Sequence, residues 1–247
     1  MENLYIRSVK IKEDLPDDEY YSKLAVIRSI KKHELKFESP VTFFVSENGM
    51  GKSTITEAIA ISLGFNAEGG TRNFNFSTKS SHSDLYKYLK ITKGIRNIKD
   101  GFFLRAESFY NFASEVDFLD EDTANNVRLV DFYGGKSLHE QSHGESFISL
   151  AENRFGGRGI YILDEPEAAL SPMKIMRLMC LMKELVKEGS QFIISTHSPI
   201  LMTFPDAEIF EFSDSGIEKV HYSETEHFMI TKRFMDAPEK MLEMLFD

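Results

Sequence analysis

Apolar and polar residues alternate in two segments near the start of the chain, LYIRSVKI at 4–11 and LAVIRSI at 24–30, and this pattern predicts strands with one buried face. A continuously apolar run, VTFFV at 41–45, predicts a central strand buried on both faces. Residues 102–110 predict another strand that runs into a turn, and apolar runs at 160–165 and 191–196 predict two strands of the parallel type. The pattern therefore predicts an α/β protein in which an antiparallel edge leads into a buried, mixed β core.

A helix is predicted between the last two of these strands. Ser171 is a candidate N-cap, Pro172 lies in the first turn, and Gly189 follows the expected end. Four methionines recur there at helical spacing and are predicted to fill the core: Met173, Met176, Met179 and Met182. By contrast, residues 64–97 are rich in Gly, Asn and Ser, which predicts loops with one short amphipathic piece.

Composition restricts the class of protein. The 247 residues can bury a full core, and 42% hydrophobic content with mixed charges excludes a disordered or fibrous chain. No apolar run approaches the roughly 20 residues that cross a bilayer, and the start of the chain does not read as a signal peptide. A soluble protein is expected, and Cys180, the single cysteine, fits a reducing cytoplasm. The net charge of -10 does not support nucleic-acid binding, although it leaves room for one local basic groove.

The segment SENGMGKST at 46–54 matches the phosphate-binding pattern G-x-x-x-x-G-K-[ST], with Ser46 in the first glycine position. Glycines let backbone N–H groups surround a polyphosphate at a helix N-terminus, while the lysine faces the β and γ phosphates and the serine hydroxyl ligates Mg²⁺. The residues predicted to contact ATP here are Asn48, Gly49, Met50, Gly51, Lys52, Ser53 and Thr54. A glycine turn before a surface helix is the alternative, but it leaves the lysine and hydroxyl unexplained.

Two adjacent carboxylates end the predicted strand at 160–165. Asp164 is placed to hold Mg²⁺ through water together with Ser53, and Glu165 is a candidate general base for the attacking water. The alternative is a solvated acidic turn, which becomes less attractive when a phosphate loop is present in the same chain.

With QSHGES at 141–146 and His197 in STHSP after the last strand, the chain resembles the ATP-binding-cassette (ABC) ATPase superfamily, in particular small soluble ATPases related to the RecF and SMC branch. In that family the signature motif touches the γ-phosphate bound by the other subunit. Here Ser142, Gly144 and Glu145 occupy signature positions. The signature stretch taken alone also fits a solvated loop.

The resemblance further implies that His197 is the switch histidine that contacts the γ-phosphate. The predicted catalytic residues are therefore Glu165, His197 and Lys52. Taken alone, a histidine after a strand is more often structural; its place one helix beyond the carboxylate pair favours the catalytic reading. The resemblance implies a P-loop NTPase fold in a single domain, 1–247, with a small helical subdomain at about 108–145 that carries the signature.

Three more positions follow from the same resemblance. Glu107 stands where the family has a glutamine near Mg²⁺; it can ligate the metal but cannot donate a hydrogen bond. Ser171 lies in a segment like the D-loop, where an acid is common. Tyr20 or Tyr21 is a candidate to stack on adenine, with surface tyrosines as the alternative. The segment between Glu107 and the signature is too short for the coiled-coil arm of SMC-type ATPases.

The function implied is Mg²⁺-dependent ATP binding and hydrolysis that drives head-to-tail homodimerisation of a soluble switch, with DNA maintenance or defence suggested by analogy with relatives. One alternative is the ATP-hydrolysing subunit of a membrane transporter, which would need a membrane partner. Another is a nucleotide-binding regulator without hydrolysis. The sequence identifies no protein client.

Overall fold

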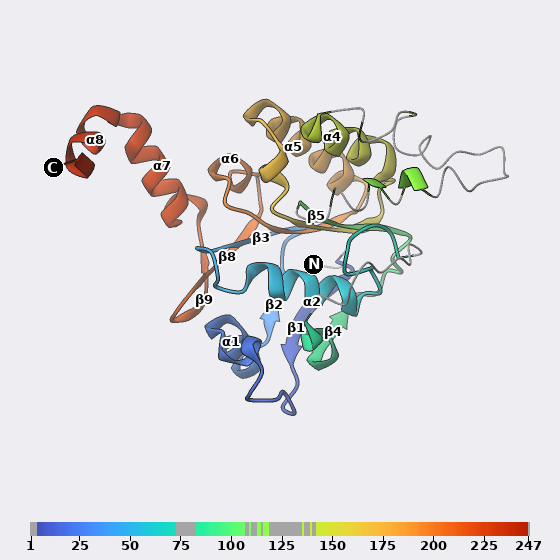
Figure 1. The fold of residues 1–247 in the computed structure, drawn as a ribbon. Helices are drawn as coiled ribbons and strands as arrows, with labels where there is room; N and C mark the ends of the chain where they lie inside the picture. Colours follow the sequence, from blue (N-terminus) through green and yellow to red (C-terminus); the bar gives the residue numbers. More distant parts are fainter. Residues whose placement is uncertain are drawn as a thin grey trace.

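The computed structural model describes residues 4–72, 83–106, 109, 113–114, 116–118, 135, 139 and 142–246. Its central feature is a six-stranded sheet with the order β5-β6-β7-β3-β8-β9 (Figure 1). The strands are β3 (Val41–Val45), β5 (Asp100–Arg105), β6 (Gly159–Asp164), β7 (Gln191–Ser195), β8 (Glu208–Ser213) and β9 (Gly216–Val220). Neighbouring strands are parallel except for the antiparallel pair of β8 and β9. The predicted α/β fold with a mixed β core is confirmed.

A second, three-stranded antiparallel sheet has the order β2-β1-β4. It contains β1 (Ile6–Ile11), β2 (Leu35–Lys36) and β4 (Leu89–Lys93). The strand predicted at 4–11 is therefore present, but it belongs to this separate sheet and not to an edge of the main one. The antiparallel edge of the main sheet is β8–β9, which the apolar pattern did not predict.

Helices cover both faces of the main sheet (Figure 1). On one face lie α4 (His143–Arg154), α5 (Pro172–Lys187) and α6 (Pro199–Met202), and on the other lie α2 (Lys52–Ser62) and α1 (Ala25–Lys32) with the small sheet. Short 3-10 helices are η1 (Tyr20–Lys23), η2 (Asp84–Tyr88), η5 (Pro166–Ala169) and η6 (Tyr222–Glu224). The P-loop NTPase architecture predicted from the motifs is thus the observed one.

Each central strand supplies side chains to two separate cores, because successive residues of a strand point to opposite faces. In β3, Phe43 packs in the core under α4 and α5, whereas Phe44 packs in the core under α1 and α2. In β6, Leu163 joins the first core and Ile162 the second. Burial on both faces explains why these strands read as continuous apolar runs.

The strand predicted at 24–30 is wrong, since these residues begin helix α1. Val26, Ile27 and Ile30 are its buried residues, and they share one helical face. Over so short a run the same apolar positions fit alternation and helical spacing almost equally well. The loop-rich reading of 64–97 missed β4, while residues 73–82 lie outside the described part of the chain.

Helix α5 begins at Pro172 with Ser171 at the N-cap position and ends before Gly189, as predicted. The expectation that its methionines fill the core is wrong for Met173 and Met176, which are 72% and 43% exposed. It is confirmed for Met182, which is fully buried, and Met179 is partly buried and packs against the same core. Leu178 and Leu185 complete the apolar face instead. Residues at 173 and 176 lie on the opposite side of the helix from that face.

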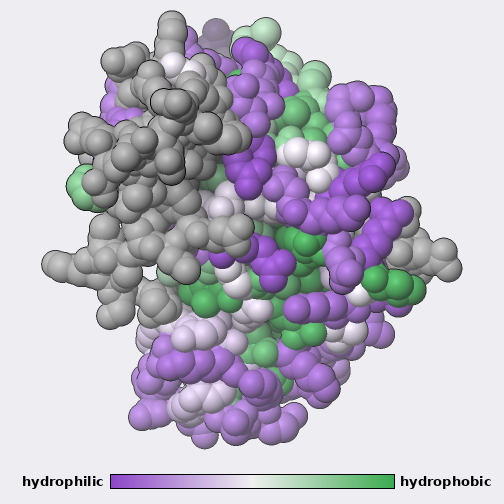
Figure 2. Space-filling view, turned by 90° about the vertical axis from the view of Figure 1, so that its right-hand side faces the viewer, coloured by the Kyte–Doolittle hydropathy of each residue, from purple (hydrophilic) through white to green (hydrophobic). Residues whose placement is uncertain are grey.

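The C-terminal helices α7 (Glu226–Asp236) and α8 (Pro238–Phe246) extend away from the two sheets (Figure 1). On the face shown in Figure 2, hydrophilic side chains cover most of the described surface and apolar ones show between them in a band near the middle. Among the described helices, none combines the length and apolar character needed to cross a membrane. The predicted helical subdomain at 108–145 falls largely outside the described residues and stays a prediction, as does the single-domain boundary.

Candidate nucleotide-binding site

The loop between β3 and α2 has the backbone that the phosphate-binding pattern requires. Gly49 and Gly51 have φ angles of 83° and 94°, in the left-handed region that favours glycine. A Cβ on Gly51 would also come within 2.9 Å of the Val26 side chain and 3.0 Å of that of Leu24. The sequence therefore needs glycine at 51 for both conformation and space, and the backbone stays open in front of the N-terminus of α2.

A cavity of about 470 Å³ lies in front of this loop. Most of the residues predicted to contact ATP line it: Asn48, Gly49, Gly51, Lys52, Ser53 and Thr54, together with Glu165. Met50 lines a neighbouring hollow of about 420 Å³ instead. Tyr20 also lines the cavity in front of the loop and is 58% exposed, whereas Tyr21 is buried in the core, so of these two tyrosines only Tyr20 borders the cavity.

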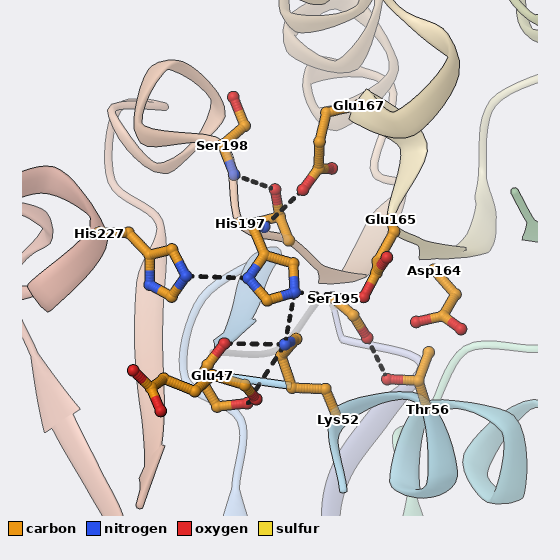
Figure 3. Close-up of polar contacts among 12 residues, drawn as sticks. Glu47, Lys52, Thr56, Asp164, Glu165, Glu167, Ser195, His197, Ser198 and His227 are labelled. Atoms are coloured by element: carbon orange, nitrogen blue, oxygen red, sulfur yellow. Dashed lines mark hydrogen bonds and ion pairs between the residues drawn. The ribbon is translucent and has the colours of Figure 1, made fainter. Parts of the chain in front are cut away.

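Lys52 is 4% exposed and reaches back across the loop (Figure 3). Its Nζ donates to the Ser46 carbonyl oxygen at 2.9 Å and to the Ser46 hydroxyl at 3.2 Å. The same Nζ lies 2.8 Å from His197 Nε2. Burial lowers the pKa of Lys52, and the carboxylates of Glu165 and Asp164 act against that shift. The ammonium group is thus held by protein acceptors at the edge of the cavity.

Asp164 ends β6 at the carboxyl edge of the sheet and is 5% exposed. Burial raises the pKa of its carboxyl to about 6, although Arg105 and the Ser195 and Ser53 hydroxyls favour the ionised form. In the described structure its Oδ1 has no hydrogen-bond partner, and Oδ2 lies 3.8 Å from Arg105 Nε.

An orphaned buried carboxylate oxygen beside a serine hydroxyl fits a Mg²⁺ ion, which binds proteins through one or two carboxylates plus water and phosphate oxygens. Among the described residues, no three His, Cys, Asp or Glu side chains are grouped so that they could hold a metal ion. Asp164 and Ser53 are the residues that could hold it. Glu107, also predicted near Mg²⁺, lies outside the described residues.

Glu165 follows in a strained backbone, with φ 53° and ψ 51°, a left-handed conformation that costs a non-glycine residue about 1–3 kcal/mol. Its N–H donates to the Ser195 carbonyl oxygen at 3.0 Å, which anchors the strained residue to β7. Its Oε1 lies 3.2 Å from His197 Nε2. With the backbone in this conformation, the Glu165 side chain lines the cavity that Lys52 borders.

His197 lies in the loop after β7 and joins several elements (Figure 3). Its backbone N–H donates to Glu167 Oε1 of η5, and its Nδ1 lies 2.9 Å from Nε2 of His227 on α7. Burial and the charge of Lys52 lower the pKa of the His197 imidazole. The three predicted catalytic side chains, Glu165, His197 and Lys52, therefore meet at one point.

Sequence reasoning missed Glu167 and His227. Glu167 could have been noticed, because it lies two residues beyond Glu165 in the same turn. Its buried carboxylate, whose pKa is raised by burial, fixes the loop that carries His197. His227 gave no signal, since it is a lone histidine 30 positions after its partner and only the packing of α7 brings the two rings together.

The signature residues lie at the start of α4 and not at this cavity. Glu145 Oε2 accepts from the Ser142 backbone N–H at 3.2 Å and from its hydroxyl at 2.7 Å. Gly144 is buried, and a Cβ there would come 2.6 Å from the Ala169 carbonyl oxygen of η5. Ser142 and Glu145 are exposed, as a contact across a subunit boundary would require. Gln141 lies outside the described residues.

Family comparison agrees with this geometry. A family model described as "AAA domain" matches residues 23–155, more than half of the chain. The chain belongs to this AAA domain family. A second model, described as "AAA domain, putative AbiEii toxin, Type IV TA system", matches residues 137–203 of this AAA domain protein. The second match contains the signature, the carboxylate pair and the loop of His197.

Two curated relatives of the AAA domain protein are transport ATP-binding proteins. The chain is 27% identical over 164 residues to the energy-coupling factor transporter ATP-binding protein EcfA1 of Fusobacterium nucleatum, covering 62% of the chain and 61% of that protein. It is 42% identical over 50 residues to the nucleoside import ATP-binding protein NupA of Lactococcus lactis, covering 20% of the chain and 10% of NupA. The chain thus matches less than two thirds of the length of either relative.

Two solved structures share the fold of the AAA domain protein. CbiO1 from Clostridium perfringens, part of the ABC transporter complex cbiONQ, has a TM-score of 0.56 at 18% identity and covers 98% of this chain and 100% of its own. The SmcHead bound to the C-winged helix domain of ScpA has a TM-score of 0.50 at 14% identity, with coverages of 87% and 97%. The predicted resemblance to ABC-type ATPases is confirmed at the level of the fold.

The departure from the phosphate-loop pattern at Ser46 is expected to matter little. Loops of this kind surround phosphate mainly with backbone N–H groups. Ser46→Gly removes a hydroxyl that accepts from Lys52 and donates to the Glu47 carbonyl oxygen, but it leaves the Ser46 carbonyl oxygen that also accepts from Lys52. We expect the ATP affinity of this variant, measured by isothermal titration calorimetry, to stay within a few-fold of the parent. A loss as large as that of Lys52→Ala would show that the loop has been misplaced.

Proposed function

We propose that this protein binds ATP with Mg²⁺ and hydrolyses it as a conformational switch. The observation that carries the proposal is the meeting of Lys52, Glu165 and His197 beside one cavity, at the carboxyl ends of β3, β6 and β7. Ligands of open α/β sheets bind at this edge. Folding alone does not explain why three costly features occur at one place. They are two glycines in the left-handed conformation, an Asp164 oxygen without a hydrogen-bond partner, and the buried Lys52.

The chain's own residues divide the work as follows. Backbone N–H groups from Asn48 to Ser53 bind the phosphates, and Lys52 turns from Ser46 and His197 towards the β and γ oxygens. Glu165 accepts a proton from the attacking water, and Oε1 is already aimed at this region by the strained backbone. Mg²⁺, held by Ser53 and Asp164, would neutralise charge on the phosphate oxygens.

We further propose that two copies close head to tail, so that the signature residues Ser142, Gly144 and Glu145 of one copy meet the nucleotide of the other. This proposal is supported by the exposure of Ser142 and Glu145, which do not line the nucleotide cavity of the same chain. ATP favours the closed pair if only that state offers the γ-phosphate both sets of contacts, and hydrolysis then releases it. In this reading residues 1–247 are one ATPase domain with its helical subdomain at about 108–145.

The second candidate function is the ATP-hydrolysing subunit of a membrane transporter. It is favoured by the 27% identity over 62% of the chain to EcfA1, a transporter ATP-binding protein. The two functions differ in their partner: a transporter subunit should be recovered from washed membranes of its native cells together with a membrane polypeptide. Recovery that depends on such a polypeptide would favour the transporter over the free-standing switch.

The test of hydrolysis is the release of inorganic phosphate from ATP by the purified protein, with and without chelation of Mg²⁺. We expect saturable release that stops when the chelator is added. Binding of ATP without any release of phosphate would instead identify a nucleotide-binding regulator and would contradict the proposed enzyme.

A further inference from the structure

A second histidine stands behind His197. His227 Nε2 lies 2.9 Å from His197 Nδ1, with the ring centroids 4.9 Å apart and the ring planes inclined by 55°. The other ring nitrogen of His197, Nε2, faces Lys52 Nζ at 2.8 Å and Glu165 Oε1 at 3.2 Å. A continuous row of polar groups thus runs from helix α7 through both rings to the edge of the cavity (Figure 3).

The start of α7 is firmly attached to the body of the protein. Thr225, the fully buried N-cap, donates from Oγ1 to the Tyr222 carbonyl oxygen at 2.7 Å and accepts from the Phe228 N–H at 3.4 Å. The Glu226 N–H donates to Glu211 Oε1 of β8 at 3.3 Å. These contacts fix the first turn, which carries His227, whereas the remainder of α7 extends outward (Figure 1).

While the Lys52 ammonium stays in place, its hydrogen bond to His197 Nε2 fixes the protons of the row, and the 3.2 Å contact between Nε2 and Glu165 Oε1 then carries no proton. A lysine ammonium has donors and no acceptor, so His197 Nε2 must accept from it. The ring proton of neutral His197 then lies on Nδ1 and is donated to His227 Nε2. His227 in turn carries its own proton on Nδ1, a buried atom without a hydrogen-bond partner among the described groups.

Two further observations indicate that both rings are neutral. Burial lowers the pKa of each imidazole, and the charge of Lys52 lowers both further. His227 also lies in the first turn of α7, where the positive end of the helix dipole disfavours an imidazolium. A neutral imidazole has one donor and one acceptor, so each ring can exchange the roles of its two nitrogens.

We infer that His227 is a positioning residue that sets the tautomer of His197: it accepts from Nδ1 while Lys52 holds Nε2, and it donates to Nδ1 once Lys52 turns to phosphate. In the second state His197 carries its proton on Nε2 and can donate it towards the cavity. No net proton is taken up, because each ring releases one from Nδ1 and gains one on Nε2 through solvent. Only the second state rests on the proposed function, because only that state needs ATP bound beside Lys52.

The first state is tested in the nucleotide-free protein by NMR of the imidazole nitrogens. We expect both His197 and His227 to be Nδ1–H tautomers, and we expect a scalar coupling between His197 Nδ1 and His227 Nε2 across their hydrogen bond. This measurement needs neither ATP nor hydrolysis, so it remains decisive even if the protein proves not to be an ATPase. An Nε2–H tautomer at His197, or the absence of the coupling, would overturn the inference.

The second state is tested with Mg²⁺ and β,γ-imido-ATP. We expect His197 to become an Nε2–H tautomer in the parent protein, but to become a mixture of the two tautomers in His227→Leu, where nothing donates to Nδ1. In steady-state hydrolysis His227→Leu should lower kcat about tenfold with KM unchanged, the effect of losing one hydrogen bond. If the tautomer and kcat of His227→Leu match those of the parent, the positioning role is excluded. Failure of the parent to bind the analogue would count against the proposed function alone.

A matched pair of variants separates positioning from simple packing. The amide of His227→Gln can reach the place of Nε2 and can donate or accept, whereas that of His227→Asn is one methylene shorter. We expect His227→Gln to retain most of the parental kcat and His227→Asn to lose as much of it as His227→Leu. The thermal stability of the Gln and Asn variants should be similar. Ile230→Ala, at a half-exposed position of the same helix, is the control and should leave kcat unchanged. Equal activities of the Gln and Asn variants would contradict a role for the hydrogen bond.

Discussion

Lys52→Ala is expected to reduce ATP turnover by at least about 100-fold, the loss that follows removal of one donor aimed at charge that develops in a transition state. Lys52 is the charged group that the loop presents to the cavity from a buried position, 4% exposed. The measurement is steady-state phosphate release at saturating Mg²⁺ and ATP. Turnover at the parental rate would contradict the placement of the phosphates in this cavity.

This loss should not result from unfolding. The pKa of Lys52 is lowered by burial, so the folded protein holds the ammonium less favourably than the unfolded chain does, and this charge does not stabilise the fold. We therefore expect Lys52→Ala to keep a Tm close to that of the parent. Lys183→Ala removes an exposed lysine from α5 and serves as the matched control for loss of one positive charge. That control should hydrolyse ATP normally.

The main sheet could be predicted because its central strands are buried on both faces. In β3, β6 and β7 every residue is buried, so the apolar runs stand out from the rest of the sequence. The outer strands β8 and β9 and the small sheet are only partly buried and include charged residues, which weakens the pattern. The sequence predicts a strand where helix α1 lies, because eight residues contain too few turns to distinguish helical spacing from alternation.

The same contrast applies to the candidate site. Lys52, Asp164 and Glu165 could be found because a local segment of backbone places each of them: a glycine loop before a helix, or the end of a buried strand. His227 and Glu167 act on His197 through contacts between elements 30 residues apart in sequence. Such contacts depend on how α7 and η5 pack, which no local pattern records.

Glu165→Gln is expected to retain ATP binding while slowing hydrolysis by about 100- to 10,000-fold, the usual contribution of a general base. The amide is nearly the same size as the carboxylate but cannot accept the proton of the attacking water. The hydrogen bond from the backbone N–H of residue 165 to the Ser195 carbonyl oxygen does not involve the side chain and remains, so the strained turn should be preserved. Because hydrolysis is proposed to open the dimer, the ATP-bound closed state should accumulate in this variant.

The proposed contact across the subunit boundary is tested by adding Ser142→Arg to Glu165→Gln. Ser142 is exposed and lies outside the cavity of its own chain, so the added bulk should prevent closure without emptying the site that Lys52 borders. Loss of the N-cap costs α4 about 1 kcal/mol, and Asn153→Arg, an exposed position in the last turn of the same helix, controls for an added arginine.

Light scattering with Mg²⁺ and ATP decides between the outcomes. The Glu165→Gln protein and its Asn153→Arg derivative should shift from the mass of one chain, 28.3 kDa, towards that of two. The Ser142→Arg derivative should stay at one chain while still binding a labelled nucleotide, because binding and closure depend on different residues. If Glu165→Gln hydrolyses ATP at the parental rate, or stays a monomer with its site saturated, head-to-tail closure is not how this ATPase works.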